Sequence, residues 1–251
     1  MNKKQRQQSI IDYIGSVSEA TIHELVRLTS SSIATIRRDL LELHEQCKLI
    51  RTPGGARNVV HQQSLVLRTF DQRRSHNAEA KLAIASRARE LVQPGMTIAI
   101  DSGTTCWQLA TQLADIKPLR ILTSAVAVIE ALGDREDIEL VVIGGIFRKS
   151  NLDFTGPQTI NAFRQYSVDL SFLGCDGYLP GKGIYTDDLN THAISQAIAY
   201  CGEKRIVLFD SDKVGQRQCC RILAEDEIDC IITDAKLEMP ANSKCEYIFA
   251  E

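Results

Sequence analysis

The stretch Ser32–Ala56, SIATIRRDLLELHEQCKLIRTPGGA, joins an amphipathic segment with an arginine pair to a Pro-Gly-Gly turn between basic residues. Ile36, Leu40 and Leu43 recur at spacings of four and three residues, which predicts a helix with one buried face. Ser32 is a suitable cap for the start of this helix. The segment KLIRTPGGARNVV that follows is typical of a hairpin, with two short extended pieces around the turn.

Two further short helices are predicted before this stretch. KKQRQQSIIDYIG places Ile10 and Ile14 on one side of a helix that should end near Gly15. TIHELVRLT repeats the apolar spacing, and Thr21 with Glu24 has the pattern of a capping box. Three helices and a terminal hairpin predict a winged helix-turn-helix over residues 1–57.

The arginine pair in the third helix indicates binding to double-stranded DNA. The second helix of a helix-turn-helix lies in the major groove, where one arginine pairs with guanine for about 1–3 kcal/mol of discrimination while another holds a phosphate. We expect Asp39 to orient an arginine. An Arg-Arg-Asp run is also typical of a solvated helix face, but the surrounding three-helix pattern favours DNA. The side chains expected to contact DNA are Ser32, Thr35, Arg37, Arg38, Arg51 and Arg57.

The charge distribution agrees with a basic head on an acidic body. The first 60 residues hold nine basic and six acidic side chains, whereas the whole 251-residue chain has a net charge of −3. No stretch approaches the roughly 20 apolar residues of a membrane helix, and the first residues lack a signal-peptide pattern, so we expect a cytoplasmic protein. The eight cysteines form no C-x-x-C pair and the five histidines are scattered, so we expect reduced thiols, no metal and no cofactor.

The rest of the chain alternates between helical and apolar extended segments. A polar stretch over residues 58–76 is predicted to be a linker with some helical content, and residues 77–251 a second domain. Its predicted strands are MTIAID, RILTS, IELVVIGG, DLSFLGCD, RIVLFD, DCIITD and EYIFA. Apolar strands that alternate with helices predict an α/β domain with a mostly parallel sheet covered on both faces.

The chain resembles the DeoR family of bacterial transcriptional regulators. TIRRDLLELHEQCKLIRTPGGA, NAEAKLAIA, IDSGTT, VIGG, Gly156-Pro157, FLGCDG and DSDK occur in the order of that family. The resemblance implies a winged helix-turn-helix joined to a sensor domain similar to ribose-5-phosphate isomerase. It also implies that the sensor binds a phosphorylated sugar and that the protein governs a carbohydrate operon, usually by repression. The chain departs from the family at two positions. Ser31 stands where the family commonly has a small apolar residue, and we expect Ile33 to supply the missing apolar contact. Pro53 stands in the wing where the family usually has histidine.

Several turns are expected to converge on one effector site. Ligands of open parallel sheets bind beyond the carboxyl ends of the strands, and IDSGTT opens a helix there, an arrangement that favours an anion. Lys213 would neutralise a phosphate and Asp176 would accept a sugar hydroxyl, although a solvated lysine and a simple Asp-Gly turn are alternatives. The residues of the predicted effector site are Asp101, Ser102, Gly103, Thr104, Thr105, Thr123, Ser124, Gly144, Gly145, Asp176, Gly177 and Lys213.

Catalysis by this domain is not expected. The related isomerases place a catalytic glutamate in the region that matches PGKGIYTDDLNTHAIS, which has none, and charge at a helix N-terminus explains Asp187 and Asp188 more simply. Ser195 stands where the regulators often have lysine, and Ser124 where asparagine is commoner, which suggests an altered ligand preference.

The predicted mechanism is a homo-oligomer that presents paired heads to operator half-sites. An effector would favour an arrangement of the oligomer in which the spacing of the heads no longer matches the half-sites. The linker would transmit this change, and Arg73 or Arg74 would tie the linker to the sensor domain. Two alternatives remain, an enzyme with an accessory DNA-binding head and a body that only oligomerises. Trp107 lies either in the ligand pocket or in the core.

Overall fold

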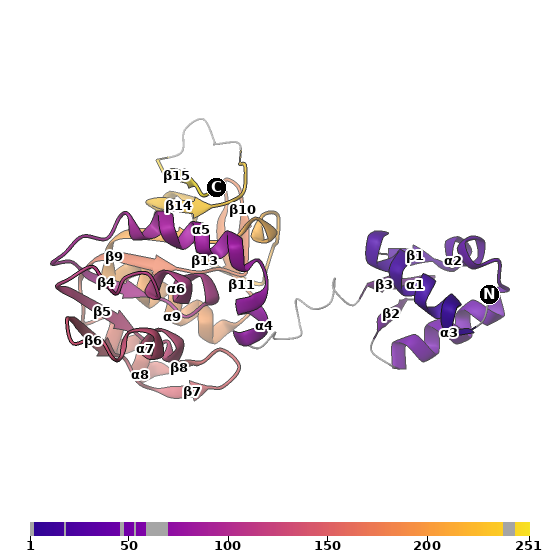
Figure 1. Cartoon of the computed structure of the whole chain (residues 1–251), viewed down its shortest axis with the longest axis horizontal. Helices are drawn as coiled ribbons and strands as arrows, with labels where there is room; N and C mark the ends of the chain where they lie inside the picture. The colour runs from indigo at the N-terminus through magenta and orange to yellow at the C-terminus, as the bar shows by residue number, and fades with distance from the viewer. Residues whose placement is uncertain (1–2, 18, 46–47, 53, 59–69, 238–243) are drawn as a thin grey trace. The chain divides into compact units, whose positions relative to one another are not determined.

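The chain folds into two compact units, Met1–Leu67 and Arg68–Glu251, which we describe separately (Figure 1). The computed structural model describes residues 3–17, 19–45, 48–52, 54–58, 70–237 and 244–251. Most of the predicted linker, and Pro53 of the wing, lie outside these described residues. The domain boundaries at residues 57 and 76 remain predictions.

The N-terminal unit, called the head below, contains three helices and a small sheet. Its elements are α1 Lys3–Val17, β1 Glu19–Thr21, α2 Ile22–Thr29, α3 Ile33–Glu45, β2 Leu49–Thr52 and β3 Gly55–Asn58. The hairpin of β2 and β3 confirms the predicted wing, and β1 adds an antiparallel strand to β3 that the sequence did not predict. Thr21 and Glu24 form the expected capping box at the start of α2.

The head has its own hydrophobic core, built from the apolar positions that predicted its helices. Ile10 and Ile14 of α1 pack with Ile36, Leu40 and Leu43 of α3, and all five are fully buried or nearly so. Because these residues lie three or four positions apart, each helix turns one stripe inward and leaves the opposite face in water.

The C-terminal unit, called the sensor below, is organised around seven parallel strands. They are β4 Thr97–Ile100, β5 Leu119–Thr123, β6 Ile138–Val142, β9 Val168–Leu173, β12 Gly202–Leu208, β14 Cys230–Thr233 and β15 Glu246–Phe249. Their order in the sheet is β15-β14-β12-β9-β4-β5-β6, and every neighbouring pair is parallel. These are the seven strands predicted from the sequence, so the α/β fold class is confirmed.

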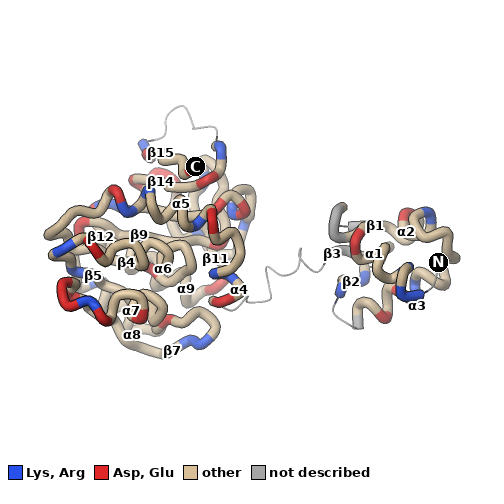
Figure 2. The backbone as a smooth tube through the Cα atoms, in the orientation of Figure 1, with Lys and Arg blue, Asp and Glu red and all other residues tan. Residues whose placement is uncertain are grey.

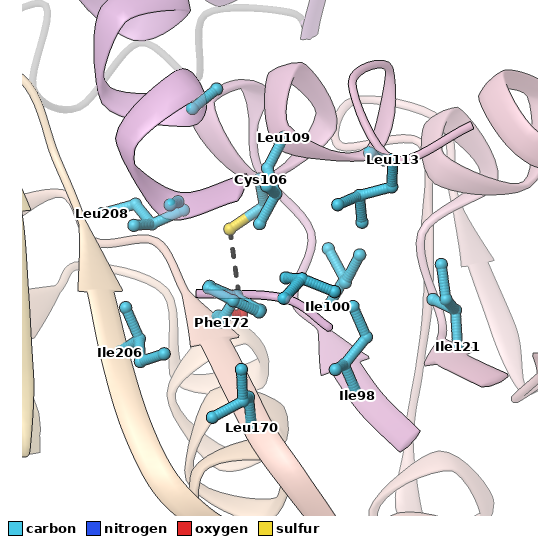
Figure 3. Close-up of a cluster of buried hydrophobic side chains, with 14 of the residues drawn as sticks. Ile98, Ile100, Cys106, Leu109, Leu113, Ile121, Leu170, Phe172, Ile206 and Leu208 are labelled. Atoms are coloured by element: carbon cyan, nitrogen blue, oxygen red, sulfur yellow. Dashed lines mark hydrogen bonds between the residues drawn. The ribbon is translucent and has the colours of Figure 1, made fainter. Parts of the chain in front are cut away.

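Helices cover both faces of this sheet. They are α4 Phe70–Ser75, α5 Ala78–Arg89, α6 Thr104–Ala110, α7 Val126–Leu132, α8 Pro157–Phe163 and α9 Leu189–Cys201. Successive side chains of a strand point to opposite faces of the sheet. Ile98 and Ile100 pack with the layer of α5, α6 and α7, whereas Ala99 packs with α8 and α9. Figure 3 shows the first of these cores, in which Cys106 of α6 faces Phe172 of β9.

Short antiparallel strands follow the ends of the parallel strands. A hairpin of β7 Ile146–Arg148 and β8 Asp153–Thr155 follows β6, and a second small sheet contains β10 Gly177–Leu179, β11 Gly183–Thr186 and β13 Cys220–Leu223. Two 3-10 turns, Ser211–Lys213 and Glu225–Glu227, complete the unit. The sequence did not predict these strands because three or four residues carry too little periodicity to recognise.

The described part of the chain offers neither a disulfide framework nor a metal cluster. Its seven cysteines are free thiols, and Cys47 lies outside the described residues. Within the same residues, His, Cys, Asp and Glu form no group of three that could hold a metal ion. Among them, too, every helix is too short or too polar to cross a membrane.

Candidate functional site

The outward face of α3 carries the arginine pair. Arg37 and Arg38 are exposed, while Ile36 and Leu40 beside them are buried in the head. Figure 2 marks the basic positions of α3 in blue. The apolar stripe therefore fixes which way the guanidinium groups can point. This geometry is the one that a recognition helix needs to reach base edges in a major groove.

Asp39 has a partner other than the two arginines of the outward face. Its side chain is 2% exposed and accepts hydrogen bonds from Arg6 Nε at 2.5 Å and Gln7 Nε2 at 3.2 Å. The hydrogen bond that Arg6 donates to Asp39 raises the pKa of Arg6. The expectation that Asp39 orients Arg37 or Arg38 is therefore wrong, since this carboxylate instead fastens α3 to α1.

The first turn of α3 uses its hydroxyl groups locally. Ser32 Oγ accepts a hydrogen bond from the backbone N–H of Thr35 at 3.2 Å, and the two hydroxyls are 2.9 Å apart. This confirms Ser32 as the cap of the helix. Ile33, which was expected to pack in the turn, is 41% exposed, so that expectation is wrong.

The wing places its basic residues on adjacent strands. Arg51 lies on β2 and is exposed, and Arg57 lies on β3, where it is paired with Ile50 of β2 and Glu19 of β1. Contacts from either residue to DNA phosphates remain a prediction.

The residues of the predicted effector site lie at the carboxyl ends of five neighbouring strands, and we call this region the carboxyl edge. Lys213 follows β12, and Asp176 and Gly177 follow β9. Residues 101–105 follow β4, Thr123 and Ser124 lie at the end of β5, and Gly144 and Gly145 follow β6. The connections run β4 to β5 to β6 on one side and β9 to β12 on the other, so the topology switches between β4 and β9. Crevices for ligands form at such switch points.

Asp101 is a buried carboxylate at this switch point, with 2% of the residue exposed. It accepts hydrogen bonds from the Ser195 hydroxyl at 2.7 Å and from the Ser102 N–H at 2.7 Å. Burial raises the pKa of Asp101 to about 7, against the lowering effect of these hydrogen bonds, and nearby Asp153 raises it further. Ser195, which stands where the family's regulators often have lysine, thus donates a hydrogen bond directly to Asp101.

Arg148 and Asp153 form a charged network that the sequence analysis missed. Arg148 of β7, 14% exposed, donates from Nε and Nη2 to the 2%-exposed Asp153 at 2.8 and 2.6 Å, and from Nη1 to Asp188 at 2.6 Å. Ser102 Oγ donates to Asp153 at 2.9 Å. The network therefore ties the β7–β8 hairpin to the loop after β4 and to the start of α9. Its only signal in the sequence was an Arg and an Asp five residues apart.

Two hydroxyl groups at the carboxyl edge have unused hydrogen-bonding capacity. Ser124 Oγ and Thr155 Oγ1 are buried without a hydrogen-bond partner among the described residues, as is Arg73 Nε. Thr123 differs, because its hydroxyl donates to the Ile100 carbonyl and accepts from the Ala125 N–H. Thr123 is thus committed to the fold, whereas Ser124 is available to a ligand.

Cations gather over the same edge. Burial lowers the pKa of Lys81, and neighbouring Lys213 and Arg73 lower it further. Burial also lowers the pKa of Arg73, with Arg148 adding to the decrease. Arg148 differs, because burial is outweighed by its hydrogen bonds to Asp153 and the charges of Asp153 and Asp188, which raise its pKa.

Helix α4 rests on the turn between β7 and β8 and on α6. The Phe70 N–H donates to the Ser150 carbonyl at 3.0 Å, and Arg73 Nη2 donates to Asn151 at 3.3 Å. Phe70 also meets the Trp107 ring edge-on at 6.3 Å, and the Arg74 guanidinium lies 5.1 Å from the centre of that ring. Both arginines therefore tie this segment to the sensor, as predicted.

The residues just after α4 are fastened to the turn that carries Lys213. His76 Nε2 lies 2.8 Å from Asp212, and Asn77 Nδ2 donates to Asp210 at 3.2 Å and to Asp212 at 2.9 Å. Lys81 Nζ donates to the carbonyls of Arg73 and His76. We call the contacts of His76 and Asn77 with Asp210 and Asp212 the α4 clamp.

Comparison with known proteins decides the family. Residues 6–62 match the model of the DeoR-like helix-turn-helix domain, and residues 76–235 match the DeoR C terminal sensor domain. The chain belongs to the DeoR family of transcriptional regulators. The DeoR-family chain is 32% identical to an uncharacterized HTH-type transcriptional regulator, YulB, of Bacillus subtilis (strain 168), over 96% of this chain and 92% of that protein.

Two further relatives of this DeoR-family regulator carry the names of sugar operons. One is a putative aga operon transcriptional repressor of Escherichia coli O157:H7, 29% identical over 95% of this chain and 88% of its own. The other is an L-fucose operon activator of Escherichia coli (strain K12), 29% identical over 93% of this chain and 96% of its own. The family includes repressors and activators alike.

The DeoR-family regulator is not an enzyme, since its family and relatives regulate transcription. Ribose 5-phosphate isomerase A from Methanocaldococcus jannaschii shares 20% identity at a TM-score of 0.41 over 55% of each chain. Asp188 caps α9 by accepting from the N–H groups of Asn190 and Thr191, which confirms its predicted role at a helix N-terminus.

Proposed function

We propose that this DeoR-family regulator binds the operator of a carbohydrate-utilisation operon and leaves it when a phosphorylated sugar binds at the carboxyl edge. The observation that carries the effector proposal is the gathering of Arg73, Lys81, Arg148 and Lys213 at one edge of the sheet, where their positive charges would attract a phosphate. The free Ser124 hydroxyl supports it, because a sugar offers hydroxyl partners.

The predicted DNA contacts follow the geometry of the head. Arg37 and Arg38 would read or position bases, and Arg51 and Arg57 would hold phosphates beside the wing. A homo-oligomer would present two heads to half-sites one helical turn apart, about 34–36 Å, or a multiple of it.

The α4 clamp supplies a physical route from the effector to the operator. Phosphate bound beside Lys213 acts on the Asp210–Lys213 turn, and this turn holds the residues directly after α4. Because α4 is the first sensor element after the segment that leads from the head, a change in the clamp changes how the two units are joined. The effector must favour one of two arrangements by its differential affinity for them.

A two-stage experiment tests the effector proposal. Thermal-shift screening of the full-length protein against sugar phosphates, phosphorylated L-fucose included, identifies a ligand. Fluorescence anisotropy with a duplex selected from random sequences then measures operator affinity with and without that ligand. Phosphorylated sugar should weaken operator binding, and the same sugar without phosphate should not.

Two substitutions locate the ligand. Lys213→Ala and Thr104→Ala should abolish the response to the sugar phosphate and preserve operator affinity in its absence. The matched control is Lys244→Ala, because Lys244 is exposed before β15, at the opposite end of the sheet. A normal response in the first two variants, or a loss in the control, contradicts the proposed site.

A further inference from the structure

Helix α3 presents an apolar side chain on the same outward face as the arginine pair. Ile33 is 41% exposed, and Arg37 follows it after four residues, so both side chains lie on one face of the helix. The partly buried side chains that pack against the described core of the head are Ile11, Tyr13, Ile22 and Val26, and Ile33 is not among them. Ile33 thus belongs to the exposed apolar side chains of the described head rather than to its core.

The polar groups of this first turn are already occupied. Ser32 and Thr35 bond to each other and to the helix backbone, and Ala34 is apolar and exposed. What the first turn of α3 offers to a major groove is thus mainly hydrocarbon. The only apolar group on the major-groove edge of a base pair is the C5-methyl group of thymine.

We propose that Ile33 reads a thymine methyl group and is a specificity-determining residue of this regulator. Four helical residues span about 6 Å along the axis, close to two base-pair steps of about 3.4 Å. The thymine should therefore lie about two base pairs from the guanine that Arg37 contacts. Exposed arginines beside Ile33 argue that the occupant of this face is a polyanion rather than a protein surface.

The test uses the full-length protein and the duplex selected from random sequences. Each thymine of one half-site is replaced in turn by deoxyuridine, which removes the C5-methyl group and leaves the base-pairing edge unchanged. For the wild type we expect one position at which affinity falls about fourfold, a factor that RT converts to roughly 0.8 kcal/mol, the contribution of one buried methylene. Ile33→Ala should show equal affinity for thymine and deoxyuridine at that position.

Matched variants keep the inference falsifiable. Leu41→Ala removes an equally exposed apolar side chain two turns further along α3 and should retain the fourfold preference for thymine. Ile33→Val keeps a branched side chain and should retain part of that preference if Ile33→Ala proves unstable in thermal unfolding.

Three results would overturn the inference. The first is an Ile33→Ala variant that keeps the full thymine preference, and the second is a wild type in which no thymine responds to loss of its methyl group. The third is an Ile33→Ala variant in which only the oligomeric state changes. The inference rests on DNA binding by the head and not on the sugar effector, so a failed effector titration leaves it intact. Conversely, if operator affinity is normal but no thymine methyl group affects it, the role of Ile33 is rejected and DNA binding by the head is not.

Discussion

Arg148→Ala should destabilise the sensor strongly. Arg148 donates four hydrogen bonds, two to Asp153, one to Asp188 and one to Thr191. Its loss leaves Asp153, which is 2% exposed, with Ser102 as its remaining side-chain donor. Removing one partner of a buried ion pair typically costs about 3–5 kcal/mol, because the other charge stays buried and unpaired. We expect a loss of this size in the free energy of unfolding.

Urea unfolding followed by Trp107 fluorescence measures this loss. Trp107 is the only tryptophan and lies in the sensor, so its signal reports that unit and not the head. Arg148→Lys should lie between wild type and Arg148→Ala, because an ammonium cannot reproduce a guanidinium fork shared by two carboxylates. Arg120→Ala, which breaks the exposed pair with Glu139, is the control and should unfold at the wild-type urea concentration. Equal midpoints for Arg148→Ala and Arg120→Ala would refute the reasoning.

Three further predictions concern the pH response, the clamp and the head. The pKa of Asp101, raised from 3.8 to about 7, means that the folded sensor binds more protons than the unfolded chain between these values. Its stability contribution is therefore lost as pH rises through this window, and Asp101→Asn should gain stability relative to wild type from pH 4 to 7, by at most about 4 kcal/mol in urea titrations. Asn77 has a left-handed backbone (φ 50°), so Asn77→Gly keeps the conformation and removes the two clamp bonds of Asn77, while His76 keeps its contact with Asp212. In the anisotropy assay this variant should bind operator normally and respond less to effector, and a full response would contradict a role for the Asn77 bonds. Arg37→Ala should relax base preference in a binding selection while Arg51→Ala weakens all sequences alike, and identical effects would contradict this division.

The sequence was sufficient to predict the large elements because they carry strong periodic signals. Residues such as Ile98, Ala99 and Ile100 belong to a strand buried on both faces, which reads as a continuous apolar run. β14 is likewise buried along its whole length, whereas the edge strands β6 and β15 are partly exposed and were recognised from their apolar residues alone. The convergence of the strands' turns at one edge follows from parallel topology alone, so the placement of Asp101 and Lys213 on that edge was also predictable.

The charged networks were not predictable because their partners are far apart in the chain. Asp39 pairs with Arg6 across 33 positions, and Arg148 meets Asp188 across 40. A local reading assigned Asp39 to its sequence neighbours, the arginines of the same helix. Tertiary packing placed it against α1 instead, and only the fold shows this.

The exposure of Ile33 escaped prediction for a related reason. An apolar residue at the start of an amphipathic helix is usually assigned to the core, yet the buried stripe of α3 begins at Ile36. Whether position 33 faces inward depends on the angle at which the turn enters the helix.

The reciprocal effect of operator and effector is the most direct test of the account. If a sugar phosphate at the carboxyl edge weakens operator binding by some factor, operator must weaken sugar-phosphate binding by the same factor, typically 5–150-fold. Calorimetric titration of the full-length protein with the identified sugar phosphate, alone and with saturating operator duplex, measures that factor. The account predicts that operator raises the Kd for the sugar phosphate by the same factor by which the sugar phosphate weakens operator binding in the anisotropy assay. An identical Kd with and without operator would contradict it.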